Sequence, residues 1–223
     1  MTTREPILIG MSGKIASGKD SIGEALMNKL VPSHVQISFG QVLKTELNFI
    51  IEQILKDTDY SFDQMKVDMG IEEKFRFQGV EVLHSLVLDK RDGLLVDAWT
   101  KTPGVRVALQ VMGTGIRREQ NENYWVDQVE NLIESHPDEA VLVTDARFPN
   151  ELDLIHRLGG YSVRLDIDPD VQKKRLFKRD GYYLITHDIS ETALDDRDDF
   201  FIRVDNSTRP FDKVVEDIYS RLR

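Results

Sequence analysis

The sequence predicts an α/β fold in which helices flank a sheet of five parallel strands. Three observations lead to this prediction. Short apolar segments alternate with longer segments whose apolar residues recur at helical spacing, a pattern typical of parallel sheets. A glycine-rich loop, GKIASGKD, joins the first apolar segment to the first helical one. Prolines also stand where three later helices are expected to begin, a position that needs no amide hydrogen.

Each predicted strand is a short, mostly apolar run. In chain order the strands are residues 7–11 (ILIGM), 35–39 (VQISF), 140–145 (AVLVTD), 161–167 (YSVRLDI) and 200–205 (FFIRVD). The later helices are expected to begin at Pro149, Pro169 and Pro210.

The helices that follow the first two strands, and the closing helix, each carry one apolar face. The first helix contributes Ile22, Ala25, Leu26 and Leu30; the second contributes Leu43, Leu47, Ile50 and Ile54; the closing helix contributes Phe211, Val214, Val215, Ile218 and Leu222.

We expect one domain over residues 1–223, with a core formed by residues 1–56 and 104–223. Residues 57–103 are richer in charge and contain no obvious buried strand. This segment is therefore expected to be a largely helical insertion attached to the core.

Composition limits the functions that fit. The 223 residues include 40% hydrophobic and 30% charged residues, an ordinary balance for a soluble globular protein. A net charge of −10 disfavours nucleic acid and anionic membranes as partners. No cysteine is present, which fits a reducing cytoplasm and excludes disulfides and thiolate metal sites. The first residues lack a signal-peptide pattern, and no apolar run is long enough to span a bilayer.

The loop at residues 13–20 predicts a phosphate site and places the fold among the P-loop NTPases. Its two glycines let consecutive backbone amides turn inward, where they and the helix N-terminus form a concave anion site. Lys19 would reach the outer phosphates as a point charge. The phosphate-binding candidates are Gly13, Lys14, Ala16, Ser17, Gly18, Lys19, Asp20 and Ser21.

Asp20 is unusual, because a serine or threonine that ligates magnesium normally follows the lysine of such a loop. Asp20 either binds the metal through water or caps its own helix. Ser21 is an alternative source of the hydroxyl. A carboxylate beside a polyphosphate requires a cation between them. The sequence therefore suggests that the metal is bound from a different side than in the usual loop.

The segment TDARFPNE supplies a second set of candidates at the end of the strand at residues 140–145. The carboxyl edge of an open α/β sheet is where ligands bind. Asp145 can position metal-bound water or activate an acceptor oxygen there, and Arg147 can clamp phosphate with two hydrogen bonds. The alternative is a surface ion pair at a strand end.

The segment GVRVALQVMGTGIRRE places Arg106, Gln110, Gly113 and Arg117 on one face if it is a regular helix. Such a face suits a phosphorylated, hydrogen-bonding small molecule. Two alternatives remain open: exposed arginines often only add solubility, and the two glycines around Thr114 can break the helix.

Residues 173–179, KKRLFKR, form a cationic cluster on a predicted helix. Arg175 and Arg179 lie on one face, and the loop-like residues that follow contain His187, Ser190 and Glu191. We interpret residues 170–198 as a lid that closes over a transferring phosphoryl group and excludes water. The alternative is a solvated helix face. His187 is assigned no chemistry; it, Ser190 and Glu191 are candidates for organising the lid.

Six segments together support a family resemblance. ASGKDS, SFGQVLK, LQVMGTGIRR, TDARFPNE, HDISE and VDNST occur in this order and resemble the bacteriophage deoxynucleoside monophosphate kinases, which are P-loop proteins similar to other nucleoside monophosphate kinases. The resemblance spans nearly the whole chain. It implies transfer of a phosphoryl group from ATP, with Mg²⁺, to a deoxynucleoside monophosphate. It also implies a cytoplasmic location, the host cytoplasm for a phage protein.

The resemblance also implies roles for individual residues. Residues 13–21 would hold the ATP phosphates, with Asp205 and Asn206 near adenine. Lys19, Asp145, Arg147, Arg175 and Arg179 would act on the transferring group. The monophosphate would face Ser38, Phe39, Lys44, Arg106, Gln110 and Arg117.

Two other functions remain open at this stage. Dephospho-coenzyme A kinase uses a similar loop, basic lid and late asparagine. A nucleotide-binding regulatory protein would hydrolyse nucleotide without an acceptor, but such a switch has little need for a second set of arginines. A homodimer is also left open, because residues 57–103 can either cover the site or pair with another subunit.

Overall fold

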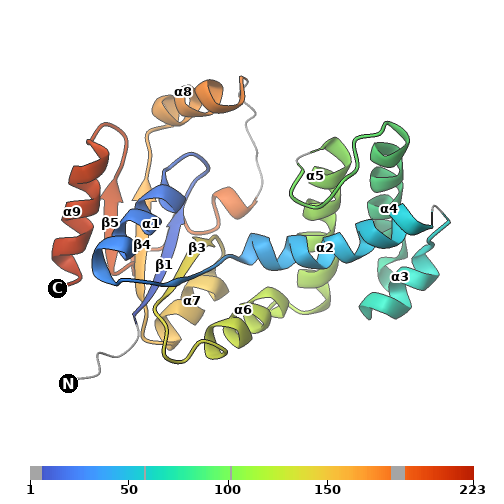
Figure 1. The fold of residues 1–223 in the computed structure, drawn as a ribbon, viewed down its shortest axis with the longest axis horizontal. Helices are drawn as coiled ribbons and strands as arrows, with labels where there is room; N and C mark the ends of the chain where they lie inside the picture. The colour runs from blue at the N-terminus through green and yellow to red at the C-terminus, as the bar shows by residue number, and fades with distance from the viewer. Residues whose placement is uncertain (1–6, 58, 101, 182–188) are drawn as a thin grey trace. The chain divides into compact units, whose positions relative to one another are not determined.

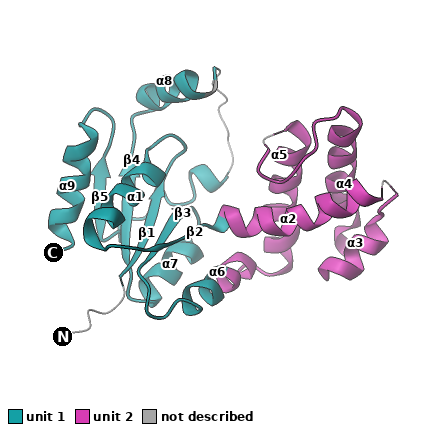
Figure 2. Ribbon diagram, in the orientation of Figure 1, with its two compact units in different colours: residues 1–39, 129–223 teal, residues 40–128 magenta. Residues whose placement is uncertain are grey.

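The computed structural model describes residues 7–57, 59–100, 102–181 and 189–223 (Figure 1). The chain forms two compact units (Figure 2). Unit 1 comprises residues 1–39 and 129–223, and unit 2 comprises residues 40–128. No helix within the described part of the chain combines the length and the apolar character that a bilayer span requires.

Unit 1 contains the predicted five-stranded parallel sheet. Its strands are β1 (Leu8–Gly13), β2 (Val35–Ile37), β3 (Val141–Ala146), β4 (Tyr161–Asp166) and β5 (Ile202–Asp205). They lie in the order β2-β3-β1-β4-β5, and every pair is parallel. The central position of β1 brings the loops after β1, β3 and β4 to the same edge of the sheet.

Helices α1 (Lys19–Leu30) and α9 (Phe211–Arg221) pack on one face of this sheet, and α7 (Pro149–Arg157) packs on the other (Figure 1). Unit 1 also contains α8 (Pro169–Asp180), η3 (Ile189–Glu191) and the end of α6 (Tyr124–Glu134).

Side-chain alternation along β1 determines which helix packs on which face. Ile9 and Met11 are fully buried in one apolar cluster with residues of α1 and α9. Gly10 points to the opposite face, where an added Cβ would lie 2.7 Å from Ile155 of α7. The central strand is therefore enclosed on both faces, and the carboxyl edge of the sheet is where ligands of such folds bind.

The predicted helix starts are close to the observed ones. Helices α7 and α8 begin at Pro149 and Pro169, whereas Pro210 is the N-cap of α9. The prediction that Phe211 points inward is wrong: its side chain is 46% exposed, because it lies in the first turn of α9, before Val214 and Ile218 enter the core.

Unit 2 is helical and has a core of its own. Its elements are α2 (Phe39–Lys56), α3 (Phe62–Met69), η1 (Glu73–Phe75), α4 (Arg76–Arg91), α5 (Pro103–Gln110), η2 (Val111–Arg118) and the start of α6. The first residue of α2 still belongs to unit 1. Leu47, Ile50 and Ile54 of α2 are fully buried in this core. The predicted insertion, residues 57–103, lies inside this larger unit, and its described residues, which leave out 58 and 101, contain no strand.

Candidate phosphate-binding site

The loop between β1 and α1 has the backbone conformation that glycine permits. Gly13 has φ 150° and Gly18 has φ 90°, and Ala16 adopts φ 63°, which is uncommon for a residue with a side chain. A Cβ on Gly13 would lie 2.5 Å from Ser17 Oγ and 2.7 Å from the Leu165 carbonyl oxygen. No other residue fits at this position without moving the backbone.

Most carbonyl groups of the loop point outward, although the Lys14 carbonyl accepts the Ser17 N–H within the loop (3.1 Å). Three consecutive carbonyl oxygens accept hydrogen bonds from side chains outside the loop. These are Ile15 from Gln172 Nε2 (2.9 Å), Ala16 from Arg175 Nη1 (3.3 Å) and Ser17 from Asn206 Nδ2 (2.7 Å).

This arrangement sets the direction of the amides. In a trans peptide the C=O of one residue points opposite to the N–H of the next. The N–H groups of Ala16 and Gly18 therefore point to the inside of the loop. Such a concave set of amides at a helix N-terminus binds anions.

Lys19, the first residue of α1, has a side chain that is only 10% exposed. Burial lowers the pKa of its ammonium group, and the positive charge of Arg147 lowers this pKa further. The carboxylates of Asp20, Asp145 and Glu191 oppose both effects. The structure thus brings Lys19, Asp145 and Arg147, which are far apart in sequence, into one electrostatic cluster.

Asp145, near the end of β3, accepts a hydrogen bond from the backbone N–H of Phe39 (2.8 Å). This bond joins the end of β3 to the first residue of α2. Because Phe39 already belongs to α2, β2 ends at Ile37, two residues before the predicted limit. The carboxylate therefore has a structural contact as well as its place beside Lys19.

Arg147 is fixed by two glutamates. Its backbone N–H donates to Glu151 Oε2 (2.7 Å), which also accepts from the Phe148 N–H and caps α7. Its guanidinium pairs with Glu191. Burial lowers the pKa of Arg147, but the nearby carboxylates, above all Glu191, outweigh burial and raise it. Arg147 therefore remains a cation near Lys19.

A cavity of about 280 Å³ lies beside the loop. Its lining residues are Ile15, Ala16, Gly18, Lys19, Asp20, Ser21, Arg175 and Arg179. Asp20 Oδ1 lies 3.6 Å from Lys19 Nζ, and the Asp20 side chain is exposed. The carboxylate of Asp20 and the hydroxyl of Ser21 offer the hard oxygen ligands that Mg²⁺ takes, so this donor set fits the predicted metal.

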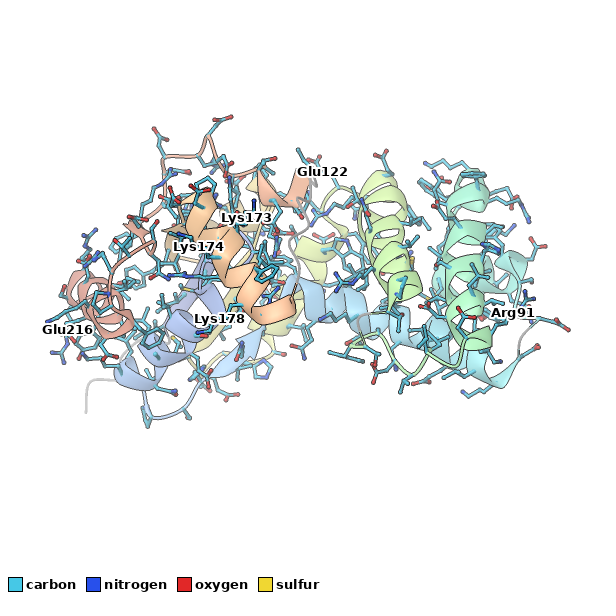
Figure 3. The ribbon with its side chains drawn as sticks, turned by 90° about the horizontal axis from the view of Figure 1, so that it is seen from above. Arg91, Glu122, Lys173, Lys174, Lys178 and Glu216 are labelled. Atoms are coloured by element: carbon cyan, nitrogen blue, oxygen red, sulfur yellow. The ribbon has the colours of Figure 1, made fainter. Side chains whose placement is uncertain are left out.

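The two predicted arginines of α8, Arg175 and Arg179, have different surroundings. The Arg175 guanidinium donates to the carbonyls of Ala16 (3.3 Å) and Asn206 (2.7 Å), so it links the loop to the segment after β5. Arg179 is exposed and lines the cavity. Lys173, Lys174 and Lys178 also project from this helix (Figure 3). Of the predicted lid, residues 182–188 lie outside the described residues, and so does His187.

The two residues expected near adenine have different surroundings. Asn206 is buried, and its amide holds the Ser17 carbonyl of the loop. Asp205 Oδ1 accepts from the Ser207 N–H (3.0 Å) in its own turn. Asn206 is therefore a structural contact of the phosphate loop.

The candidates for binding the monophosphate are divided between the units. Ser38 and Phe39 belong to unit 1, and Phe39 is buried. Lys44, Arg106, Gln110 and Arg117 belong to unit 2.

Arg117 does not share a face with Arg106 and Gln110. The helix continues past Gly113 and Gly115, but as a π-helix, η2, whose wider turn shifts the residues that follow. Arg106 and Gln110 are exposed, whereas Arg117 is buried, pairs with Glu46 and donates to the Met69 carbonyl (2.8 Å).

An ion network around the buried Arg164, next to the loop, was not predicted. Arg164 of β4 donates to Ser12 Oγ (3.0 Å) and to Asp195 Oδ1 (2.6 Å), and Asp195 also pairs with Lys14 of the loop (2.9 Å). The one sequence signal was an arginine in the middle of an otherwise apolar strand, since a buried charge requires a partner.

Comparisons with known proteins identify the fold. No family model matches the chain, and no curated protein matches it in sequence. A shikimate kinase from Aquifex aeolicus vf5 has a similar structure, with a TM-score of 0.50 and 15% identity, over 97% of this chain and 96% of that chain. A gluconokinase from Sinorhizobium meliloti 1021 gives a TM-score of 0.46 and 16% identity over 98% and 93%.

A dephospho-CoA kinase from Campylobacter jejuni gives a TM-score of 0.40 and 15% identity, over 97% of this chain and 96% of that chain. The likeness to the shikimate kinase, together with the parallel sheet and its flanking helices, shows that the chain has the fold of P-loop kinases. At 15% identity the likeness shows the fold alone.

Proposed function

We propose that the protein is a deoxynucleoside monophosphate kinase that transfers the γ-phosphoryl group of ATP to a deoxynucleoside monophosphate. The observation that carries the proposal is the loop at residues 13–19, with its carbonyls bound outward and Lys19 and Arg147 beside it. A P-loop kinase fold supports the same reaction class. The six sequence segments favour a nucleoside monophosphate as the acceptor.

In this proposal the loop amides and Lys19 bind the ATP phosphates. Asp20 and Ser21 would hold Mg²⁺, directly or through water, and the ion would supply positive charge next to the phosphates when bound. Arg147 stabilises the phosphoryl group in transfer with a planar guanidinium that a lysine cannot replace. No covalent intermediate is needed, because alignment of two anions and charge neutralisation account for most of such a reaction.

Helix α8, the described start of the predicted lid, would close over the bound nucleotide. Arg179, exposed on the wall of the cavity, is the lid cation best placed to reach a phosphate. Arg175 would act mainly by fixing the loop, since it already binds backbone carbonyls. Ser38, Phe39, Lys44, Arg106 and Gln110 remain the candidates for acceptor binding. Arg117 is the least suited, because its guanidinium is bound to Glu46.

The remaining aspects of the proposal follow from charge and composition. With a net charge of −10, the partners are expected to be small anions held by local cations and not nucleic acid or membranes. We expect the enzyme to act in the cytoplasm, that of the host if its source is a phage. A homodimer remains compatible with this activity.

A coupled ADP-release assay tests the proposal. The protein is incubated with ATP, Mg²⁺ and each of the four deoxynucleoside monophosphates, with dephospho-coenzyme A as a further acceptor and an arm without acceptor. We expect turnover that requires a deoxynucleoside monophosphate. Turnover only with dephospho-coenzyme A, or equal ADP release without any acceptor, would show that the proposed acceptor is wrong.

A further inference from the structure

Glu191 uses both of its carboxylate oxygens at the phosphate loop. Its Oε2 accepts the backbone N–H of Ile15 (2.8 Å), and its Oε1 pairs with Arg147 Nη1. The side chain is only 12% exposed. Glu191 belongs to η3 and lies 176 residues after Ile15 in the chain. One carboxylate therefore connects the loop after β1 with the residue that follows β3.

This contact determines where the guanidinium of Arg147 lies. Arginine has a long side chain with many rotamers, and fixing it in one place is unfavourable in entropy unless a partner holds it. The backbone of Arg147 is already held by Glu151. Glu191 is itself held by the Ile15 amide, so it fixes the guanidinium relative to the loop. A guanidinium has five N–H donors, so the same group can still bind a phosphoryl oxygen.

A second acid of the same segment gives an independent anchor. Asp195 pairs with Lys14 of the loop (2.9 Å) and with Arg164 (2.6 Å). Loss of Glu191 alone should therefore leave the segment attached to the loop. Asp195 binds the same loop as Glu191 but a different arginine, and it lies four residues away, so it is a matched control.

We infer that Glu191 is a positioning residue that holds Arg147 against the phosphate loop in the orientation needed to bind the terminal phosphate of ATP. The inference rests on the proposed function for the identity of the nucleotide. It assigns Glu191 no direct contact with substrate. Because Arg147 would face the γ-phosphate, the role should affect ATP, which has that phosphate, far more than ADP, which lacks it.

A double-mutant cycle on nucleotide affinity tests this role. The dissociation constants for MgATP and MgADP are measured by calorimetry for the wild type, Glu191→Ala, Arg147→Ala and the double variant. We expect Glu191→Ala to weaken ATP binding about tenfold and ADP binding less than twofold. In the Arg147→Ala background, Glu191→Ala should have almost no further effect on ATP, because its partner is already absent.

Two further variants separate positioning from general damage to the fold. Glu191→Gln keeps the shape and an acceptor for the Ile15 amide but loses the charge, so it should give an intermediate loss of ATP affinity. Asp195→Asn should leave the ratio of ATP to ADP affinity as in the wild type. Losses that add in the cycle, or an equal loss for ATP and ADP, would overturn the positioning role.

Tighter ATP binding by Glu191→Ala would also overturn it, because the carboxylate would then be a competitor of phosphate for the Ile15 amide. The proposed function is judged separately, by acceptor-dependent turnover of the wild type. If the wild type binds ATP but phosphorylates no deoxynucleoside monophosphate, the acceptor is wrong, and the affinity cycle still decides the role of Glu191.

Discussion

Lys19 illustrates how this site departs from what stability alone would favour. The residue carries its charge into a largely buried position, next to the positive charge of Arg147. Burial and that repulsion lower the pKa of Lys19, so the charged form is less favourable in the folded protein than in water. The charged form of Lys19 is therefore strongly stabilised when a polyphosphate binds next to it.

Replacing Lys19 by methionine should therefore make the unliganded protein more stable at neutral pH. Methionine keeps an unbranched stem of similar length and removes the buried charge. We expect a higher melting temperature in Lys19→Met, by roughly 2–4 °C for each kcal/mol of charge penalty removed. ATP affinity should fall at least tenfold at the same time. Differential scanning calorimetry and nucleotide titration measure the two effects.

The dependence on pH gives this prediction a definite sign. Between the lowered pKa of Lys19 and the usual value for lysine, the unfolded chain holds a proton that the folded protein has released. The free energy of unfolding should rise with pH in that window, and the rise should be absent in Lys19→Met. Lys178→Met, at an exposed position on α8, is the control and should change stability little. A destabilised Lys19→Met would contradict the account.

At the scale of elements, the strands were predictable because each is a short apolar run followed by a turn or helix signal. All five predicted strands lie within two residues of their observed limits. The face of the helix from Arg106 to Arg117 was not predictable, because the π-helical turns of η2 change the residue spacing. Periodicity assumes a constant number of residues per turn, and two glycines weaken that assumption.

The segment after β5 is expected to stabilise the phosphate loop through Asn206. Its buried amide is the partner of the Ser17 carbonyl, so Asn206→Ala would leave a buried acceptor unsatisfied. We expect the free energy of unfolding to fall by about 1–3 kcal/mol. Urea denaturation followed by circular dichroism measures this decrease.

Gln172→Ala is the matched comparison for this prediction. Gln172 makes the same kind of bond, from a side-chain amide to the Ile15 carbonyl, but it is only half-buried, so water can replace it. Its removal should destabilise the protein less than the removal of Asn206. Equal stability of Asn206→Ala and the wild type would show that this bond does not support the loop.

For the whole molecule, the sequence indicated which loops meet at the sheet edge but not which side chains touch one another there. Lys19, Asp145 and Arg147 could be grouped because each lies at or after the carboxyl end of a predicted parallel strand. The contacts of Glu191 and Asp195 depend on how a segment with no strand pattern packs back on the loop. Likewise, the predicted insertion covers only part of unit 2. Helices α2 and α5 also pack in the core of unit 2, because apolar periodicity indicates a buried face but not the core against which it packs.

Because the two units have separate cores, we expect bound nucleotide to stabilise them against unfolding to different extents. The described residues of the phosphate site, from the loop to Asn206, lie in unit 1, whereas both tryptophans of the chain, Trp99 and Trp125, lie in unit 2. A ligand that binds one folded unit stabilises that unit by mass action, by about 2.7 kcal/mol at a concentration of 100 times its dissociation constant. Tryptophan fluorescence follows unit 2, and circular dichroism follows both units.

We therefore expect MgATP to raise the unfolding temperature seen by circular dichroism more than the temperature seen by tryptophan fluorescence. Trp125 is a suitable probe, because it is buried and its indole N–H donates to the Gly113 carbonyl (3.0 Å), a hydrogen bond that breaks when unit 2 unfolds. Lys19→Met with MgATP is the control and should remove the difference, since that variant binds nucleotide poorly. An equal shift of both signals in the wild type would mean that the two cores unfold as one cooperative unit.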